Sequence, residues 1–580
     1  MPVKCARKIL ALAGVAALWS GLCARGQSWP ASTSWVASWG ASQQIPEPQN
    51  ALPAHDLTAE APRIARSASG GQLIVAGKPY LILGGELGNS SAGTAAQADS
   101  ILPRLAQMHV NTVLMPVAWE QMEPAEGAFD FSILDHWVAV AREQHLHLVP
   151  LWFGSWKNGV SSYAPAWVKQ DSKRFPRAES AEGEELEILS TLGVETRNAD
   201  GRAFAALMRH LRETDQNQQT VLMVQVENEV GYLGRGRDRS PEANRLFEGQ
   251  APSDLLQKLQ SKRDSFSPEL RAHFNAAGKT WREVFDDSAD EVFMAWNYAR
   301  YIEAVAEAGK REYPLPMYVN CQLPGPGERA GEYPSGGPHP YYLVIYRVSA
   351  PSLDFYSPDI YWPDFEYWID RYRVAGNAVF VPEARMDTAP YNALYAYGGA
   401  RAFGFSPFGI DSVRPSASET VSGPDIASVY DVLSQMSDLL LKSQASGNIR
   451  ALVLHRDSPR PTRTVALGGY MFEATLSRSW PARTLASDDG AMIIMEAGSD
   501  EFYVAGSGLS VSFARDPDAD SKLAGIASIE EVSRANGAWV TLRRLNGDQS
   551  NQGRQLQMDP HQMRIYRVKL YAIDRHGSGL

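Results

Sequence analysis

The chain has 580 residues, of which 44% are hydrophobic and 21% are charged, and its formal net charge is −11. This length exceeds one ordinary domain and predicts a large domain with one or two smaller ones. An acidic chain without a basic stripe or tail binds polyanions poorly, so we expect no nucleic acid partner.

Residues 1–27 have the order of residue types found in a secretory signal peptide. Lys4, Arg7 and Lys8 precede the apolar residues 9–22, and small residues follow. The apolar run is short for a membrane span, and the alternatives are an uncleaved anchor or a lipidated Cys23. We expect a periplasmic or secreted protein with no stable membrane span after removal of the signal. Of the 3 cysteines only Cys321 would remain, which predicts no internal disulfide.

Residues 28–70, rich at first in Ser, Ala, Pro and Gln, are predicted to be an N-terminal arm or linker. From residue 71 to residue 447, eight apolar, β-branched runs alternate with helical patterns. The runs are residues 80–88, 112–119, 145–156, 221–229, 316–322, 353–362, 378–386 and 401–409. This alternation predicts an α/β fold, a (β/α)8 TIM barrel with insertions. An open doubly wound sheet is the alternative.

Residues 448–580 have a different pattern of apolar and polar residues. Short strand patterns are separated by Gly, Asp, Ser and Asn, with no clear helix between most of them. We expect a smaller all-β, sandwich-like accessory domain. Within the barrel, residues 164–220, 233–279 and 324–340 follow the third, fourth and fifth strands and should lie on the catalytic face.

Residues at the C-terminal ends of barrel strands line the active site of this fold. The chain places carboxylates, amides, a phenol and indoles at these positions. They are Glu86, Trp119, Trp156, Asn158, Asn228, Glu229, Asn320, Tyr361 and Glu383. Such side chains fit a neutral, hydroxyl-rich substrate, although the indoles could equally pack in the core. The sequence has no His/Cys cluster, HExxH, phosphate loop or GxSxG, so we expect no metal and no organic cofactor.

Two of these carboxylates predict glycoside hydrolysis. Glu229 and Glu383 end the fourth and seventh strands and could face each other across the barrel mouth, one as proton donor and one as nucleophile. Arg385 should favour an ionised Glu383, and the neighbouring Glu227 should raise the pKa of Glu229. Glu366 competes with Glu383 for the nucleophile's role.

One difficulty concerns the fourth strand. Asn228 and Glu229 would point to opposite sides of a regular strand. Both can face one site only if the strand ends or is distorted there, and we predict such an irregularity. Glu227 is then expected to be structural.

Three segments resemble glycoside hydrolase family 35, the retaining β-galactosidases with catalytic glutamates on strands four and seven. They are VQVENEVGYLG from Val224, WEQMEPAEGAFDF from Trp119 and VPEARMD from Val381. The resemblance spans about residues 71–411. It implies that Glu229 is the acid/base, that Glu383 is the nucleophile and that Asn228 binds the sugar hydroxyl beside the anomeric carbon.

Further roles follow from the same resemblance. Tyr361 would steady the nucleophile, with Tyr356 as the alternative. The β-rich C-terminal part fits the accessory domains of a bacterial branch of the family. GGELGNSS from Gly84 and LWFGSWKNG from Leu151 depart from the well-studied animal and fungal members, so their galactose contacts do not carry over.

The expected function is that of a retaining, exo-acting β-galactosidase. It would remove terminal β-D-galactosyl residues from oligosaccharides or plant cell-wall side chains such as xyloglucan. A β-glucosidase, mannanase or arabinosidase of the same clan is an alternative, and so is a non-catalytic carbohydrate-binding barrel. A Schiff-base aldolase needs a lysine at an interior strand end, whereas we expect Lys157 to lie beyond its strand.

Overall fold

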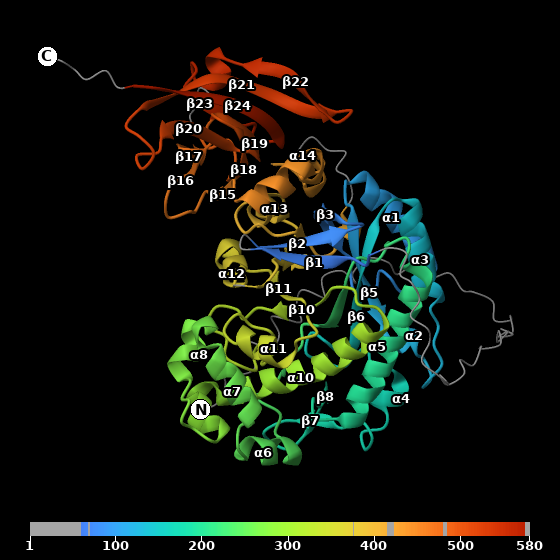
Figure 1. Cartoon of the computed structure of the whole chain (residues 1–580). Coiled ribbons are helices and arrows are strands. Elements are labelled where there is room, and N and C mark those ends of the chain that lie inside the picture. The colour runs from blue at the N-terminus through green and yellow to red at the C-terminus, as the bar shows by residue number, and fades with distance from the viewer. Residues whose placement is uncertain (1–59, 68–69, 375, 414–422, 480–483, 575–580) are drawn as a thin grey trace, which may run out of the picture. The chain divides into compact units, whose positions relative to one another are not determined.

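The structure is a computed structural model that describes residues 60–67, 70–374, 376–413, 423–479 and 484–574 (Figure 1). The predicted signal peptide and residues 28–59 of the predicted arm lie outside the described residues. None of the helices in the described ranges is long and apolar enough to cross a membrane.

A nearly closed barrel of parallel strands forms the larger part of the protein. The strand order is β12-β14-β4-β5-β6-β9-β10-β11-β13. The strands are β4 Ile82–Glu86, β5 Thr112–Ala118, β6 His147–Lys157, β9 Val224–Asn228, β10 Met317–Gln322, β11 Phe355–Ile360, β12 Phe380–Val381, β13 Glu383–Ala384 and β14 Gly404–Phe405. Each of the eight predicted runs contains strand residues, and the predicted barrel is confirmed.

The seventh run is divided into β12 and β13 by Pro382. Proline has no N–H group to donate to a neighbouring strand, so it interrupts a ladder. β12 pairs with β14, where Phe380 is opposite Gly404, and β13 pairs with β11, where Glu383 is opposite Asp359. The two halves of one strand therefore join both ends of the curved sheet.

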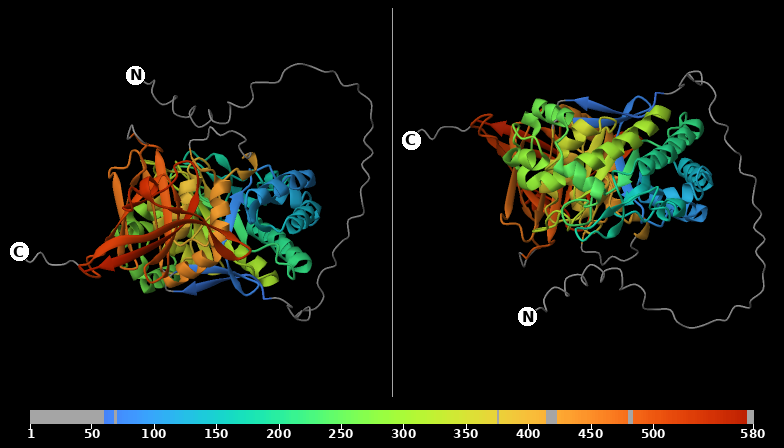
Figure 2. Two further views of the ribbon diagram at one scale, coloured as in Figure 1. Left: turned by 90° about the horizontal axis from the view of Figure 1, so that it is seen from above. Right: turned by 90° about the horizontal axis from the view of Figure 1, so that it is seen from below.

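Helices cover the outside of the barrel, and in Figure 2 they flank its strands in both views. The longer ones are α1 Ala95–Gln107, α3 Ser132–Glu143, α5 Val194–Asp215, α10 Ala289–Glu312, α13 Ala389–Gly398 and α14 Ile426–Ser446, and shorter ones are α2 Trp119–Met122, α11 Leu343–Ser349 and α12 Phe365–Arg371. Their apolar sides pack on the strands in one large cluster. The interior is filled separately by a cluster that includes Leu151, Tyr318, Phe355 and Phe380. These side chains pack the barrel interior below the C-terminal ends of the strands, so the described part of the barrel has no open pore.

The segments after the third and fourth strands carry short elements of their own. They are α4 Ala166–Lys169, β7 Arg177–Glu179, β8 Glu185–Leu189, α6 Pro241–Glu248, α7 Ser253–Ser261, α8 Pro268–His273 and α9 Trp281–Phe285. Before the barrel, a three-stranded antiparallel sheet forms from β1 Arg63–Ser67, β2 Gly70–Val75 and β3 Lys78–Tyr80. The sequence analysis did not predict this sheet.

The C-terminal part consists of antiparallel sheets, which confirms the predicted all-β region. One sheet has the order β15-β18-β19-β24-β21-β22, and the other has the order β16-β17-β20-β23. The strands are β15 Ile449–His455, β16 Thr462–Leu467, β17 Tyr470–Leu476, β18 Asp489–Gly498, β19 Glu501–Ser507, β20 Leu509–Arg515, β21 Leu523–Ala535, β22 Ala538–Leu545, β23 Gln555–Gln557 and β24 Arg564–Ile573. They surround a core of their own, with Phe472, Ile494 and Val568 among its members.

Candidate active site

The end of the fourth strand is distorted, as predicted. Glu227 has a φ of 62° and Glu229 a φ of 45°, in the left-handed region that residues other than glycine rarely adopt. The backbone N–H of Glu229 donates a 2.8 Å hydrogen bond to Oδ1 of Asn320 on β10. Such backbone strain persists only where the surroundings impose it, and it concentrates at functional sites.

This distortion brings Asn228 and Glu229 to the same place. One carboxylate oxygen each of Glu229, Asp359 and Glu383 lies within 4.8 Å of the others. Asn228 also reaches the group, because its Nδ2 donates to Oε1 of Glu383 at 3.4 Å. All four side chains are almost completely buried.

Glu383 is held by three donors. Tyr361 donates its hydroxyl to Oε2 at 2.6 Å, and Asn320 donates Nδ2 to Oε1 at 3.3 Å, beside the bond from Asn228. Burial raises the pKa of the Tyr361 phenol, so the hydroxyl keeps its proton and remains a donor. These bonds orient the carboxylate of Glu383 toward Glu229.

Glu229 has a different environment. Burial, and next the charge of Glu383, raise the pKa of Glu229 to about 8, while the ammonium group of Lys157 acts in the opposite direction. The Nδ2 of Asn158 donates to Oε2 of Glu229. At neutral pH Glu229 is therefore a protonated acid, facing a carboxylate that is held by hydrogen bonds.

Glu86 lies at the end of the first strand and is fully buried. Neither of its carboxylate oxygens has a hydrogen-bond partner among the described residues. Burial, and next Glu383, raise the pKa of Glu86 well above its usual range. Buried polar groups are normally paired, so this carboxyl group is suited to bind a polar group of a substrate.

The sequence analysis missed Asp359. Its Oδ2 accepts a 2.7 Å hydrogen bond from Nδ2 of Asn320, and burial together with Glu383 raises its pKa. Asp359 lies inside the apolar strand β11, whereas the prediction considered only residues at the ends of strands. Alternation along β11 could have found it, because Phe355, Asp359 and Tyr361 share one face and Phe355 fills the barrel interior.

The prediction for Lys157 is wrong. β6 extends through Lys157, whose side chain is buried beside the carboxylate cluster. Burial acts to lower the pKa of Lys157, but Glu383 and Glu229 outweigh it and the pKa is raised. The extra length arises because β6 shifts its register against β9 between Trp152 and Lys157.

Glu227 stabilises the register shift of β6 against β9. Its Oε2 accepts a 2.8 Å hydrogen bond from the backbone N–H of Trp156. The role expected for Glu227, structural rather than catalytic, agrees with this contact.

Trp119 and Trp156 were predicted either to bind the substrate or to pack in the core, and the structure places both in the core. Both are fully buried. Trp119 donates its indole N–H to Oε2 of Glu123 at 2.7 Å, and Trp156 donates to the carbonyl oxygen of Leu189 at 3.1 Å. Their faces pack against other aromatic rings, so both indoles belong to the packing around the barrel.

Contacts correct the expectation for Arg385 and exclude two of the alternatives, Glu366 and Tyr356. Arg385 forms an ion pair with Asp387 rather than with Glu383. Glu366 pairs with Arg463, so it is not free to act as a nucleophile. Tyr356 is buried against Tyr346, and Tyr361 is the phenol that reaches Glu383.

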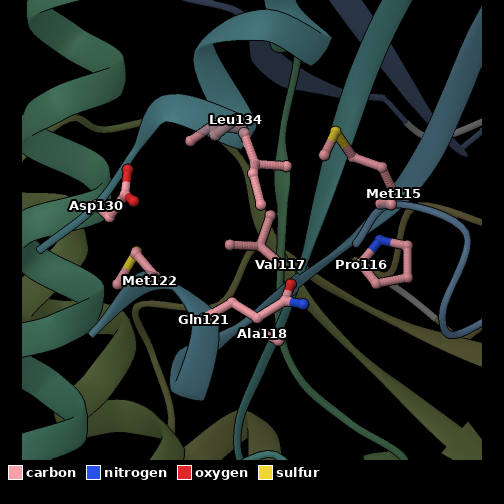
Figure 3. A pocket seen from close by; sticks show the side chains of 10 residues that line it. Met115, Pro116, Val117, Ala118, Gln121, Met122, Asp130 and Leu134 are labelled. Carbon is pink, nitrogen blue, oxygen red and sulfur yellow. The ribbon is translucent and has the colours of Figure 1, made fainter. Parts of the chain in front are cut away.

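A cavity of about 40 Å³ lies beside β5 and α3 (Figure 3). Met115, Val117 and Leu134 are typical of its lining, and Gln121 and Asp130 are its polar side chains. It is too small for a sugar, because ligand pockets usually span roughly 300–1,000 Å³. The carboxylate cluster is therefore the stronger candidate for the active site.

Glu229, Asp359 and Glu383 could each offer one oxygen to a cation. A protonated Glu229 is a poor ligand, however, and Lys157 already supplies positive charge beside the group. The arrangement fits proton transfer and nucleophilic attack better than metal binding.

Two family models match the chain. A model described as Beta-galactosidase, glycoside hydrolase family 42, matches residues 91–283. A model described as a domain of unknown function, DUF5597, matches residues 426–557. No curated protein sequence matches the chain. Neither model is that of glycoside hydrolase family 35, which three segments of the chain resemble.

Solved structures with a similar chain course include two β-galactosidases. The enzyme from the psychrophilic Marinomonas ef1 has 12% identity and a TM-score of 0.42, over 62% of this chain and 60% of that chain. The enzyme from Rahnella sp. R3 has 16% identity and a TM-score of 0.38, over 57% and 50%. The catalytic domain of a Paenibacillus polymyxa β-amylase has 12% identity and a TM-score of 0.40, over 58% and 94%. The present chain thus spans less than two thirds of the length of both β-galactosidases.

The family match covers β5, β6 and β9 and also Glu229, the residue that follows β9. This part of the barrel is therefore similar to a family of glycoside hydrolases.

Proposed function

We propose that the protein is a retaining, exo-acting β-galactosidase that works by double displacement. The observation that carries the proposal is the proximity of Glu229 and Glu383, with an oxygen of each within 4.8 Å of the other. Retaining glycosidases hold their carboxyl groups roughly 5–5.5 Å apart, and inverting enzymes leave a wider gap for water.

The two carboxyl groups have the properties that two steps require. Glu383 attacks the anomeric carbon and forms a glycosyl ester, while protonated Glu229 gives its proton to the departing oxygen. The Glu229 carboxylate then takes a proton from water, and that water cleaves the ester and frees Glu383.

Two further side chains, Asn228 and Glu86, are positioned to hold the sugar. Oδ1 of Asn228 and both oxygens of Glu86 are buried and have no partner among the described residues, so they can bind sugar hydroxyls. Asn158 and Asn320 act through the carboxyl groups that they contact. Lys157 limits the negative charge of the cluster.

The natural substrate in this proposal is a terminal β-D-galactosyl residue on an oligosaccharide or on a plant cell-wall side chain such as xyloglucan. The motifs that resemble family 35 support this choice, as does the Beta-galactosidase model. The signal-like residues 1–27 favour a periplasmic or secreted location.

The position of Lys157 invites comparison with a Schiff-base enzyme. A Schiff-base lysine needs a lowered pKa, so that the amine is free to attack a carbonyl carbon. The neighbouring carboxylates raise the pKa of Lys157 instead. Amine catalysis is therefore not the proposed chemistry.

The test compares wild type, Glu229→Ala and Glu383→Ala on a panel of nitrophenyl glycosides, with azide as an external nucleophile. We expect cleavage of the β-galactoside and a loss of at least about 10²-fold in kcat for both variants. Azide should rescue Glu229→Ala with formation of β-galactosyl azide and Glu383→Ala with formation of the α-anomer.

Glu366→Ala is the matched control, because Glu366 follows the sixth strand but pairs with Arg463. It should retain activity. If the wild type cleaves a different glycoside and both variants lose that activity, the mechanism would stand and the proposed sugar specificity would change. Full activity in Glu229→Ala or Glu383→Ala would reject the assignment of that carboxylate.

A further inference from the structure

A cavity of about 360 Å³ lies between the loops that follow β10 and β11. It falls within the roughly 300–1,000 Å³ range of small-molecule sites. Its lining comes from two short segments and from α12. The lining residues are Pro324, Gly325, Pro326, Gly327, Glu328, Tyr333, Tyr341, Trp362, Pro363, Asp364, Tyr367 and Trp368. We call it the Trp362 cavity.

The lining of the Trp362 cavity is next in sequence to residues that contact the carboxylate cluster. Tyr361, whose hydroxyl reaches Glu383 at 2.6 Å, is the residue before Trp362. Trp362 donates its indole N–H to the carbonyl oxygen of Leu323 at 3.3 Å, and β10, which carries Asn320, ends one residue earlier. The strands that present Asn320 and Asp359 thus continue into the lining of the cavity.

Specific contacts fix the loop after β10, which forms one side of the cavity. Tyr232 and Ser335 exchange backbone hydrogen bonds of 2.8 and 3.0 Å, which ties this loop to the segment after Glu229. The hydroxyl of Tyr333 donates to Glu291 at 2.9 Å, and Glu328 accepts the backbone N–H of Gly325 at 2.6 Å. The cavity is therefore built into the fold.

The chemistry of the lining selects among ligands. Five aromatic side chains contribute to it, and the charged members are Glu328 and Asp364. No Lys or Arg occurs in this lining, and Arg371, which lies over the rings of Tyr341 and Tyr367, is paired with Glu269. A neutral ligand therefore fits the lining better than a phosphate or a carboxylate. Tyr367 is 52% exposed, an unusually high value for a large aromatic side chain. Aromatic faces with nearby carboxylates match the apolar faces and hydroxyl groups of neutral sugars.

We propose that the Trp362 cavity binds the part of an oligosaccharide substrate that lies beyond the terminal galactosyl unit. The proposal rests on the proposed function and adds a site to it. The carboxylate cluster would take one sugar unit, and the aromatic side chains of the cavity would take its neighbours. Binding energy from such remote units can raise kcat/KM without any change at the reacting carbon.

The test compares two substrates that differ only in the leaving group. β-D-Galactosyl fluoride leaves a single atom, which cannot occupy the cavity, whereas a galactosylated xyloglucan oligosaccharide leaves a chain of sugars. We expect Tyr367→Ala and Trp362→Phe to lower kcat/KM for the oligosaccharide by about tenfold, the size of a lost contact in a substrate pocket. Hydrolysis of the fluoride should be unchanged.

Tyr571→Ala is the matched control, since Tyr571 lies on β24 and is similarly exposed, at 45%. It should change neither rate. Equal losses on both substrates or an unchanged oligosaccharide rate would overturn the proposal.

Failure of the wild type to hydrolyse the fluoride would contradict the proposed function alone. The cavity is then judged by calorimetric titration of the same oligosaccharide into the Glu383→Gln variant. Binding that Tyr367→Ala weakens about tenfold would support the site. Absent binding, or binding that this change leaves intact, would reject it.

Discussion

Glu229 owes its acid character to burial and to the charge of Glu383, which raise its pKa to about 8. A general acid works only while it carries its proton, so the proposed first step should proceed below pH 8. Above that pH we expect kcat/KM to fall about tenfold per pH unit, because this parameter reports the free enzyme. The measurement is the pH dependence of kcat/KM on a β-galactoside.

Substitution of Lys157 tests whether the fall in kcat/KM at high pH comes from Glu229. Its ammonium group lowers the pKa of Glu229, so Lys157→Met should move the decline in kcat/KM to higher pH. A profile that stays level through pH 10 in wild type, or a decline that Lys157→Met moves to lower pH, would contradict the acid role of Glu229.

The site residues at strand ends were predicted from the sequence, and those inside strands were missed. Glu229, Tyr361 and Glu383 each follow an apolar run, where the barrel fold exposes them to one site. Asp359 escaped because it lies within such a run, and Lys157 because a register shift lengthens its strand. Trp119 shows the opposite error, since its position at a strand end was correct but Glu123 holds its indole in the core.

At the scale of the element, the segment after β9 depends on Gly231. Its φ is 151°, and an added Cβ would lie 2.3 Å from the backbone carbon and oxygen of Pro334. Gly231→Ala should therefore push apart the loops after β9 and β10 and disturb Glu229, two residues away. We expect a loss of stability of about 1–3 kcal/mol and reduced kcat, measured by thermal unfolding and by hydrolysis rates.

Gly327→Ala separates steric overlap from backbone strain. Gly327 lies in the loop after β10 with a φ of 80°, but an added Cβ there would meet nothing within 4 Å. Gly327→Ala should lower the free energy of unfolding only by the cost of its positive φ, about 1 kcal/mol. It should leave kcat unchanged on β-D-galactosyl fluoride, which does not reach the Trp362 cavity. Equal effects of the two substitutions would show that the contact with Pro334 is unimportant.

The eight strand runs were predictable because parallel strands buried on both faces are continuously apolar. The division of the seventh run was not predicted, although Pro382 lies in its middle. The small sheet of β1, β2 and β3 was also missed. β3 has only three residues, Lys78–Tyr80, too few for a recognisable alternation.

At the scale of the whole molecule, the C-terminal sheets pack against the barrel at α13. Gly398 lies at the last turn of this helix, and an added Cβ would lie 2.6 Å from Cγ1 of Ile493 and 2.8 Å from Cβ of Ala451. Gly398→Val should force β15 and β18 away from the helix. Overpacking of this kind costs typically about 1–3 kcal/mol.

Thermal unfolding and limited proteolysis would measure this effect. We expect a lower Tm and faster cleavage near residues 447–449, between α14 and β15. Gly498→Val is the control, since it lies at the end of β18 with no atom within 4 Å of an added Cβ. An unchanged Tm for Gly398→Val would mean that the two parts do not stabilise each other through this contact.

The division of the seventh strand ties catalysis to the completion of folding. Glu383 is held by β13 on one side of Pro382, while β12 joins β14, whose Gly404 pairs in turn with Ile82 at the start of the barrel. Contacts so distant along the chain form late, because the loop they close is long. We therefore expect Glu383 to take its place opposite Glu229 late in refolding, when β13 pairs with β11. If the proposed function holds, the gain of hydrolytic activity during refolding should then follow the formation of the barrel.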